Sequence, residues 1–496
     1  MFSLTQSYQP APTPDGRAPR AAATGLLAAA AVLLSGCLSL EPAYVRPAPP
    51  IPAALPQGGA YPGAQATAPP APDVAWRDFF TDPKLQAVIA QALANNRDLR
   101  VAALNIAEAR AQYQAQRAGL LPHVNAGAQG FYESEPSALL GATSGATAKA
   151  NENVYIRYYS ANLGVSNYEV DLWGRVRSLS RQALEQYLAT DEARRAVQIS
   201  LIAEIATDYV TYAADLERLN VARATARSDA ESLRLTQTRF DGGVASELDV
   251  RQAEAPLEQA QADVTTYTTT VAQDLNALTL LAGAPVASDL LPGPMGDGML
   301  TIADLPAGLS SDVLLRRPDV LQAEHQLKAY NASIGAARAA FFPSLSLTGQ
   351  GGTASLSLSR LFSAGTGIWS FTPQVSLPIF DAGLNTANLR YAKAERAVAV
   401  AQYEKAVQTA FREVADALAQ RGQAGEYVAA EQRLAASADR ALVLSRERYA
   451  RGSDSYLSTL TAETASYSAQ QSLVAARLTR ATNLITLYRT LGGGVR

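Results

Sequence analysis

Residue types that build chemical sites are scarce in this chain. Its 496 residues include two histidines and one cysteine, so a metal site made of the usual nitrogen and sulfur ligands is not expected. The single cysteine, Cys37, also excludes a disulfide within the chain. A basic excess is missing, because 42 Lys and Arg face 45 Asp and Glu and leave a formal net charge of -3. We therefore expect no nucleic-acid partner.

Catalytic motifs are missing as well. We find no nucleophile paired with a base and no Gly-rich phosphate loop in a suitable context, so the sequence does not predict an enzyme or a cofactor.

The start of the chain has the pattern of a signal peptide. Two arginines precede an apolar run over 26–34, which is too short to span a membrane but suits a signal peptide. The following Leu-Ser-Gly-Cys sequence resembles a bacterial lipobox, in which the cysteine is lipidated and becomes the first mature residue. The alternative is an ordinary signal peptide with an incidental cysteine. We predict a signal peptide over 1–36 and lipidation at Cys37, and Leu38, which is not the aspartate that often signals inner-membrane retention, indicates the outer membrane.

Two stretches of the chain, 239–254 and 448–463, are copies of each other at a separation of 209 residues. Both carry a glycine followed by a serine three residues later. Glycine can end a helix in the left-handed conformation and serine can cap the next helix, so each copy predicts a tight turn between two helices. The residues in these roles are Gly243 and Ser246 in the first copy and Gly452 and Ser455 in the second.

The rest of the chain also reads as a duplication. Residues 37–75, rich in Pro, Ala and Gly, predict a lipidated N-terminus and an extended tether outside any core. A first repeat over 76–310 comprises a helix to about Leu121, a hairpin, a long helix, a turn, a helix and a connector. A second repeat over 311–496 has the same order without the connector. The expected hairpins are 122–171 and 343–381, and the expected turns are 239–247 and 448–456.

The two long helices and the alternating strands constrain the architecture. The helical stretch before Gly242 contains no Pro or Gly over a length of about 100 Å, which few globular domains could hold. Leu345 and Leu347 alternate with polar residues, as do Phe371, Val375, Leu377 and Ile379, so each strand has one apolar and one polar face. Periodicity alone also fits a sheet over a soluble core.

In a membrane such strands must close into a barrel. Four strands per chain are too few, because single-chain bacterial barrels begin at about eight strands. Association of two or three chains therefore stays open, and a polar lumen favours the larger number.

Several runs resemble the outer-membrane factors of tripartite efflux pumps, the TolC/OprM-like proteins, and in particular their NodT-type lipoprotein branch. The most specific are 168–175, 305–319, 377–383 and 491–494. The resemblance implies an α+β membrane protein: a homotrimeric 12-stranded outer-membrane β-barrel with four strands per chain, continued by a long periplasmic α-helical barrel.

The resemblance also implies the site residues. The two turns would form the periplasmic gate, where Leu457 falls on the family's apolar constriction and Ser458 and Thr461 replace aspartates found in other members. That departure removes an expected ring of carboxylates, and Asp454, Glu463 and Asp249 are candidates to supply negative charge instead. The expected contacts of a periplasmic adaptor protein are Gly242, Gly243, Val244 and Gly452.

The function expected from the resemblance is a passive exit duct for small molecules such as drugs. The implied partners are two further copies of the chain, the adaptor, an inner-membrane transporter of the RND type and outer-membrane lipid, with the protein anchored by lipid and extending into the periplasm. A duct for type I protein secretion and a structural lipoprotein that braces the envelope are the alternatives. The alternating strands argue against the brace, because a brace needs no lumen.

Overall fold

The computed structural model describes residues 39–61, 75–136, 153–296 and 310–493. Cys37 and the predicted signal peptide lie outside these residues. The chain forms two compact units. We call the part made of Gly119–Ser178 and Gly335–Thr386, with residues up to Glu41, the sheet unit, and the part made of Pro42–Ala118, Leu179–Ile334 and Ala387–Arg496 the helical unit.

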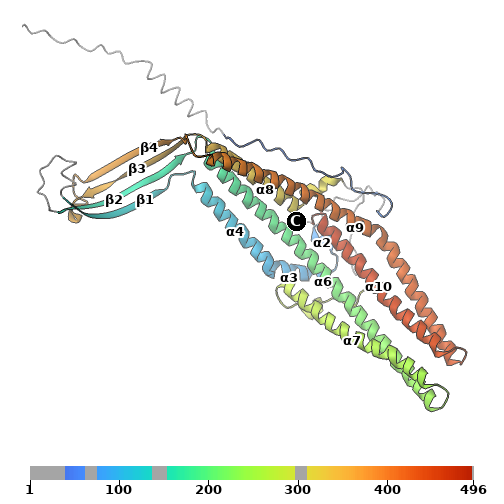
Figure 1. Cartoon of the computed structure of the whole chain (residues 1–496). Coiled ribbons are helices and arrows are strands. Elements are labelled where there is room, and N and C mark those ends of the chain that lie inside the picture. Colours follow the sequence, from blue (N-terminus) through green and yellow to red (C-terminus); the bar gives the residue numbers. More distant parts are fainter. Residues whose placement is uncertain (1–38, 62–74, 137–152, 297–309, 494–496) are drawn as a thin grey trace, which may run out of the picture. The chain divides into compact units, whose positions relative to one another are not determined.

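The sheet unit contains one antiparallel sheet in the order β1-β2-β3-β4 (Figure 1). Its strands are β1 (Val124–Pro136), β2 (Asn153–Val170), β3 (Ser344–Ser355) and β4 (Gly367–Ser376). Pairing of β2 with β3 joins the two hairpins. Strand β4 ends earlier than the alternation predicted, because Ser376 pairs with the first residue of β3 and the following residues have no partner on that strand. Leu377 and Ile379 are therefore exposed residues beyond the strand.

The register places apolar residues of all four strands on one face, although Ile368 and Phe131 lie on the other. Directly opposite residues in a sheet share a face, and Val375 lies opposite Leu345, which in turn lies opposite Val170. The other face is mostly polar, and on it the Asn162 side chain donates to Gln350 at 3.1 Å. Within the described residues, the outer strands β1 and β4 each have one strand neighbour. The sheet thus has two distinct faces and two unpaired edges.

Aromatic packing fixes the end of this sheet. Trp173 stacks on Phe342 with ring centroids 4.6 Å apart, and its indole nitrogen donates to the carbonyl of Pro343 at 2.8 Å. Trp173 therefore packs the corner where strands give way to helices. Trp369, by contrast, is 82% exposed on β4.

The helices repeat in the same order as the sequence copies. Two short 3-10 helices, η2 (Ser288–Leu290) and η3 (Ser311–Arg316), lie between α7 and α8, and a third, η4 (Leu358–Arg360), lies between β3 and β4. Helices α4 (Arg97–Ala118) and α8 (Pro318–Ala339) both have 22 residues, and α6 (Arg175–Asp241) and α9 (Leu384–Ala450) both have 67. Each long helix leads through a turn into a shorter one, α7 (Glu247–Ala282) or α10 (Tyr456–Thr490). None of the helices within the described ranges combines the length and apolar character needed to cross a membrane.

The first predicted helix is interrupted. It is two helices, α3 (Pro83–Asn95) and α4, preceded by the short α2 (Trp76–Phe79). The break falls at Asn96, whose backbone is extended and whose side-chain oxygen accepts from the Leu99 amide at 2.8 Å. The same side chain donates to the carbonyl of Leu281 at 2.9 Å. The prediction of one continuous helix was therefore wrong. Asn96 caps the start of α4, and its contact with Leu281, a residue distant in the sequence, holds its side chain in the capping position.

The N-terminal segment packs against the helical unit. It has no regular structure, as predicted for a tether, but Leu55 is buried in the core. Glu324 on α8 binds Arg46 at 2.6 Å and accepts from the Tyr44 hydroxyl at 3.1 Å. The expectation that residues 39–61 lie outside any core was therefore wrong. Their contacts come from residues far away in the sequence, which local composition does not reveal.

Candidate functional site

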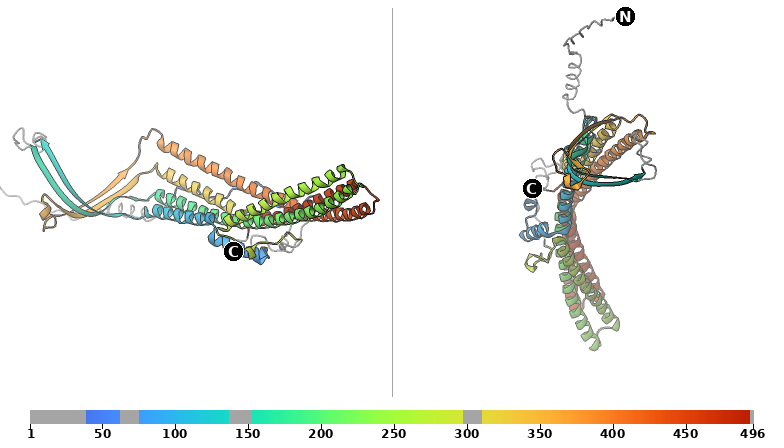
Figure 2. Two further views of the ribbon diagram at one scale, coloured as in Figure 1. Left: turned by 90° about the horizontal axis from the view of Figure 1, so that it is seen from below. Right: turned by 90° about the vertical axis from the view of Figure 1, so that its left-hand side faces the viewer.

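The two predicted turns lie at the same end of the helical unit (Figures 1 and 2). We call residues 239–247 the first turn and residues 448–456 the second turn. In the first turn, the Val244 amide donates to Arg239 and the Gly243 amide to Phe240, while Gly243 has a φ of 74°. This is the Schellman arrangement that ends a helix with a left-handed glycine. The second turn repeats it with Ser453, Arg448, Gly452 and Tyr449, and Gly452 has a φ of 71°.

The two turns differ in how the next helix begins. Ser246 and Asp249 form a reciprocal capping box at the start of α7. Ser455 has the extended backbone of a capping residue, but its side chain makes no capping bond. The prediction that both serines cap was thus wrong for Ser455. Three residues after Ser455, where Asp249 stands in the first copy, the chain has Ser458, which has no carboxylate to complete a capping box. The nearby Asp454 binds Arg448 at 2.6 Å.

Capping and pairing occupy the two acidic side chains predicted at the gate, Asp249 and Asp454. Hydrogen bonds from Ser246 hold the pKa of Asp249 below its usual range, and the hydrogen bond from Arg448 does the same for the pKa of Asp454. Both groups are therefore ionised at neutral pH, and each already has a positive or hydrogen-bonding partner.

An aromatic contact joins the turns to each other. The Arg239 guanidinium lies 4.7 Å from the centre of the Tyr449 ring, and Tyr449 packs edge to face on Tyr456 at 5.4 Å. A cation over an aromatic ring contributes about 0.5–1 kcal/mol at an exposed site. The arginines at equivalent positions of the two copies thus have different partners, since Arg448 binds a carboxylate and Arg239 binds a ring.

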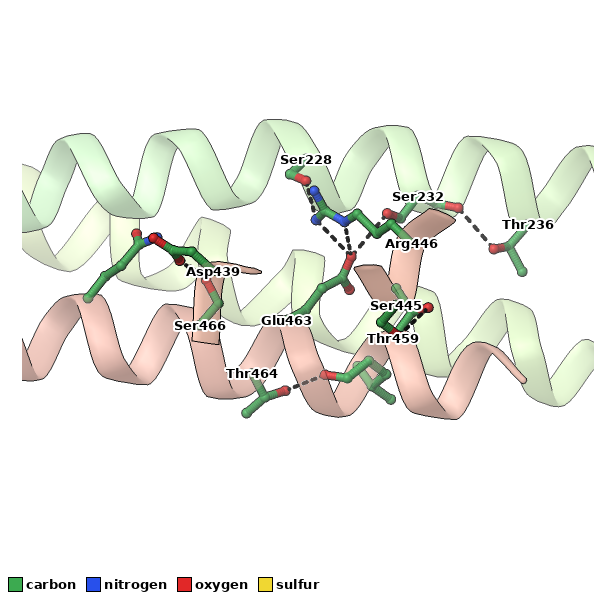
Figure 3. Close-up of polar contacts among 12 residues, drawn as sticks. Ser228, Ser232, Thr236, Asp439, Ser445, Arg446, Thr459, Glu463, Thr464 and Ser466 are labelled. Atoms are coloured by element: carbon green, nitrogen blue, oxygen red, sulfur yellow. Dashed lines mark hydrogen bonds and ion pairs between the residues drawn. The ribbon is translucent and has the colours of Figure 1, made fainter. Parts of the chain in front are cut away.

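A partly buried polar cluster lies farther along the helices (Figure 3). Its centre is Arg446 of α9, which binds Glu463 of α10 at 2.9 Å and donates to the Ser228 hydroxyl of α6 at 2.5 Å. Ser232 of α6 also donates to Glu463, at 3.3 Å. The cluster therefore connects three helices. We call Ser228, Asp229, Ser232, Arg446 and Glu463 the helix-end cluster.

This cluster carries more negative than positive charge. Asp229 is 3% exposed and Glu463 is 6% exposed, and one oxygen of each carboxylate has no hydrogen-bond partner. Burial and the neighbouring Glu463 raise the pKa of Asp229 to about 6, although Arg446 opposes the shift. Glu463 is too buried to supply charge at the constriction, so that expectation was wrong. Six residues after Leu457, it points to the other side of α10.

Three of the predicted gate residues share one exposed face at the start of α10. Leu457, 56% exposed, lies four residues before Thr461, and Ser458 lies beside them. The Thr461 hydroxyl donates to the carbonyl of Leu457 at 2.9 Å. Val244 in the first turn is exposed as well, at 70%. Within the described residues, no group of three or more His, Cys, Asp and Glu side chains is arranged to hold a metal ion.

Comparison with known proteins identifies the family of this chain. The family model described as outer membrane efflux protein matches residues 88–284 and 309–493. The chain belongs to this family. The match spans both repeats, including the sheet, the long helices and both turns.

Relatives and solved structures agree with this membership. The chain is 46% identical over 468 residues to the toluene efflux pump outer membrane protein TtgC of Pseudomonas putida, covering 94% of this chain and 95% of the relative. The antibiotic efflux pump outer membrane protein ArpC of Pseudomonas putida matches with the same identity and coverage. The open state of the MtrE outer membrane channel of Neisseria gonorrhoeae superposes with a TM-score of 0.81 at 39% identity, covering 92% of this chain and 99% of that one.

The expectations for family, fold and general function are thereby confirmed. This outer membrane efflux protein has the TolC-like channel fold, with a four-stranded antiparallel sheet and long helices in each chain. It is a non-enzymatic outer-membrane channel of an efflux pump. Sequence reasoning missed the Arg446 contacts and the stacking of Arg239 on Tyr449. The local signal for the cluster was one charged residue on each of three predicted helices, namely Asp229, Arg446 and Glu463.

Proposed function

We propose that three copies of this outer membrane efflux protein form a closed duct that passively conducts small molecules. The observation that carries the proposal is the mainly polar face that runs across all four strands, opposite the face that carries Val170, Leu345 and Val375. In a bilayer the edges of β1 and β4 need partners, because unpaired backbone groups in hydrocarbon are costly. Pairing those edges between copies satisfies them, and three copies give twelve strands around a polar lumen.

The gate of this duct is the ring that three copies of the exposed Leu457 face make at the second turn. Ser458 and Thr461 lie on the same face and bring hydroxyl groups rather than charges to it. Asp454 and Asp249 contribute negative potential from the turns, although Arg448 and Ser246 already bind them. We therefore assign the closed state mainly to apolar contact between the leucines.

The partners follow from which residues remain free to bind. Gly242, Gly243 and Val244 of the first turn and Gly452 of the second are exposed, and glycine leaves the backbone open to a partner's approach. We assign these four residues to the periplasmic adaptor, which connects the duct to an inner-membrane transporter of the RND type. Lipid on Cys37 anchors each chain to the outer membrane, and the helices extend into the periplasm.

Antibiotics and apolar solvents are the proposed cargo. The names of the relatives describe one as part of a toluene efflux pump and another as part of an antibiotic efflux pump. A lumen lined by Asn, Gln, Ser and Thr has no specific pocket for one of these compounds, so we expect broad selectivity.

Planar-bilayer recording of the purified protein tests the duct. We expect conducting events from the assembled trimer, and correctly assembled trimers that never conduct would refute it. Deletion of the gene tests the cargo. Sensitivity to antibiotics and toluene should rise, whereas loss of a secreted polypeptide with unchanged drug tolerance would favour type I secretion.

A further inference from the structure

A cavity of about 530 Å³ lies between helices α6, α7 and α10, next to the helix-end cluster. Both buried carboxylates of that cluster, Asp229 and Glu463, line it. Its size falls within the range of about 300–1,000 Å³ that is usual for small-molecule sites. Every lining residue belongs to the helical unit.

The charges around the cavity favour a cation. One oxygen of Glu463 accepts bonds from Arg446 and Ser232, but its other oxygen and one oxygen of Asp229 have no partner. Two buried carboxylates thus share the charge of one arginine. Leaving a buried charged acceptor without a partner is costly, so one further positive charge would compensate the site.

Arg251, which also lines the cavity, does not supply that charge. It lies on α7 with its side chain 65% exposed, and its guanidinium binds Glu254 at 2.7 Å and Glu247 at 3.5 Å. Two carboxylates on its own helix therefore compensate Arg251. The buried pair keeps its excess of negative charge.

The walls of the cavity are suited to an apolar body. Ala255, Pro256, Ala260 and Leu460 line it together with the two carboxylates. Pro256 is inside α7 and has no amide hydrogen, so the carbonyl of Gln252 loses its usual helical donor. Gln252 lines the cavity too.

We propose that this cavity is a binding site for a monocationic amphiphile, an organic ammonium compound whose apolar part lies against α7 and whose charge lies between Asp229 and Glu463. Leu457, Ser458 and Thr461 are not among the residues that line the cavity. A bound molecule contacts three helices and links them near the turns.

Calorimetric titration of the assembled protein in lipid nanodiscs tests this proposal, with 1-naphthylmethylammonium as the probe. Its neutral analogue, 1-naphthylmethanol, has nearly the same shape and lacks the charge. After subtraction of empty nanodiscs, we expect one ammonium per chain, bound at least tenfold more tightly than the alcohol. Equal affinities of the two compounds, or no binding of the ammonium, would overturn the proposal.

Substitutions locate the site. Asp229→Asn should weaken ammonium binding at least tenfold, whereas Asp241→Asn, on the exposed end of the same helix, should leave it unchanged. Glu463→Gln is a second variant with the same expected loss, in case one of them does not assemble. If only Asp241→Asn weakens ammonium binding, or if assembled Asp229→Asn and Glu463→Gln bind the ammonium as tightly as the unsubstituted protein, the compound binds elsewhere.

Acidification gives an independent measure. Asp229 faces Arg446 of α9, Glu463, Tyr456 and Tyr467 of α10, and Arg251 of α7. Burial and the neighbouring Glu463 raise the pKa of Asp229 to about 6, so Asp229 takes up a proton near that pH. Ammonium affinity should therefore fall severalfold between about pH 7.5 and about pH 5, while the weak binding of the alcohol stays constant. A pH-independent ammonium affinity would count against Asp229 as the counter-ion.

Discussion

Asp229 and Glu463 show how differently two buried carboxylates can be compensated. Glu463 accepts from Arg446 and Ser232, which spread its charge over donors from two helices. Asp229 interacts electrostatically with both Arg446 and Glu463, and, like Glu463, it has one oxygen without a donor. Burial raises the pKa of Asp229, so its ionised form is disfavoured in the folded chain.

Asp229→Asn should stabilise the fold at neutral pH. The folded state raises the pKa of Asp229 from 3.8 to about 6, so the folded chain holds this proton more tightly than the unfolded chain does. The ionised carboxylate then destabilises the fold above pH 6, and the penalty disappears as the pH falls toward the unfolded value. We expect a gain on the order of 1 kcal/mol at about pH 7.5 and none at about pH 4. Thermal unfolding followed by circular dichroism measures it, and an equal gain at both pH values would contradict this explanation.

Leu457 is the residue on which the proposed gate depends. Leu457→Ala removes most of the apolar side chain from each of the three copies, so current through the closed channel should increase severalfold in planar bilayers. Leu248→Ala is a matched control, because Leu248 occupies the equivalent position of the first copy and is similarly exposed, at 65%. An unchanged closed state in Leu457→Ala would place the constriction elsewhere.

At the scale of elements, the two turns share a backbone and differ in side chains. Both end a long helix with a left-handed glycine, but the first turn is closed by a capping box and the second by an ion pair across the turn. An exposed ion pair contributes about 0–1 kcal/mol and weakens with salt. The second turn, which carries the Leu457 face, is therefore the more easily rearranged of the two.

Gly452→Ala tests the left-handed turn. Its φ of 71° costs an alanine about 1–2 kcal/mol, although there is open space where the new Cβ would lie. The matched control is Gly425→Ala, which also enters open space but lies inside α9, where alanine is favoured by about 1 kcal/mol. We expect faster hydrogen exchange across residues 448–456 only in Gly452→Ala. If hydrogen exchange across residues 448–456 in Gly452→Ala is equal to or slower than in the unsubstituted protein, the left-handed glycine is not required for this turn.

At the scale of the whole molecule, one chain is incomplete as a membrane structure. Its sheet has an apolar face, a polar face and edges at β1 and β4, and only other chains can pair those edges in a closed barrel. The trimer and the duct are thus a single proposal. A protein that stays monomeric in the membrane could not conduct by this route.

Cys37→Ser tests the proposed anchor. The variant should lose incorporation of labelled palmitate, since the lipidated thiol is gone, while the unchanged barrel strands still allow channel formation. Palmitate labelling followed by membrane fractionation measures both effects, and Ser35→Ala serves as a control within the same segment. Labelling that persists in Cys37→Ser would show that the lipid is attached at another residue.

Local patterns were enough to predict most of the elements. Glycines and serines at fixed spacing predicted the two turns, and alternation of apolar and polar residues predicted the faces of β3 and β4. The duplicated turns predicted two equivalent long helices before them, and α6 and α9 do have equal lengths. These features depend on residues close together in the chain, so the sequence by itself determined them.

Other features were decided only when distant segments met. Asn96 breaks a predicted helix because Leu281 holds its side chain, and the predicted tether packs on α8 because Glu324 binds Arg46. Glu463 becomes a buried partner of Arg446 rather than an exposed charge, and the cavity beside it is lined by residues of α6, α7 and α10. Burial and pairing depend on which helix faces lie together, and sequence spacing within one helix does not specify that, so only the tertiary structure could decide them.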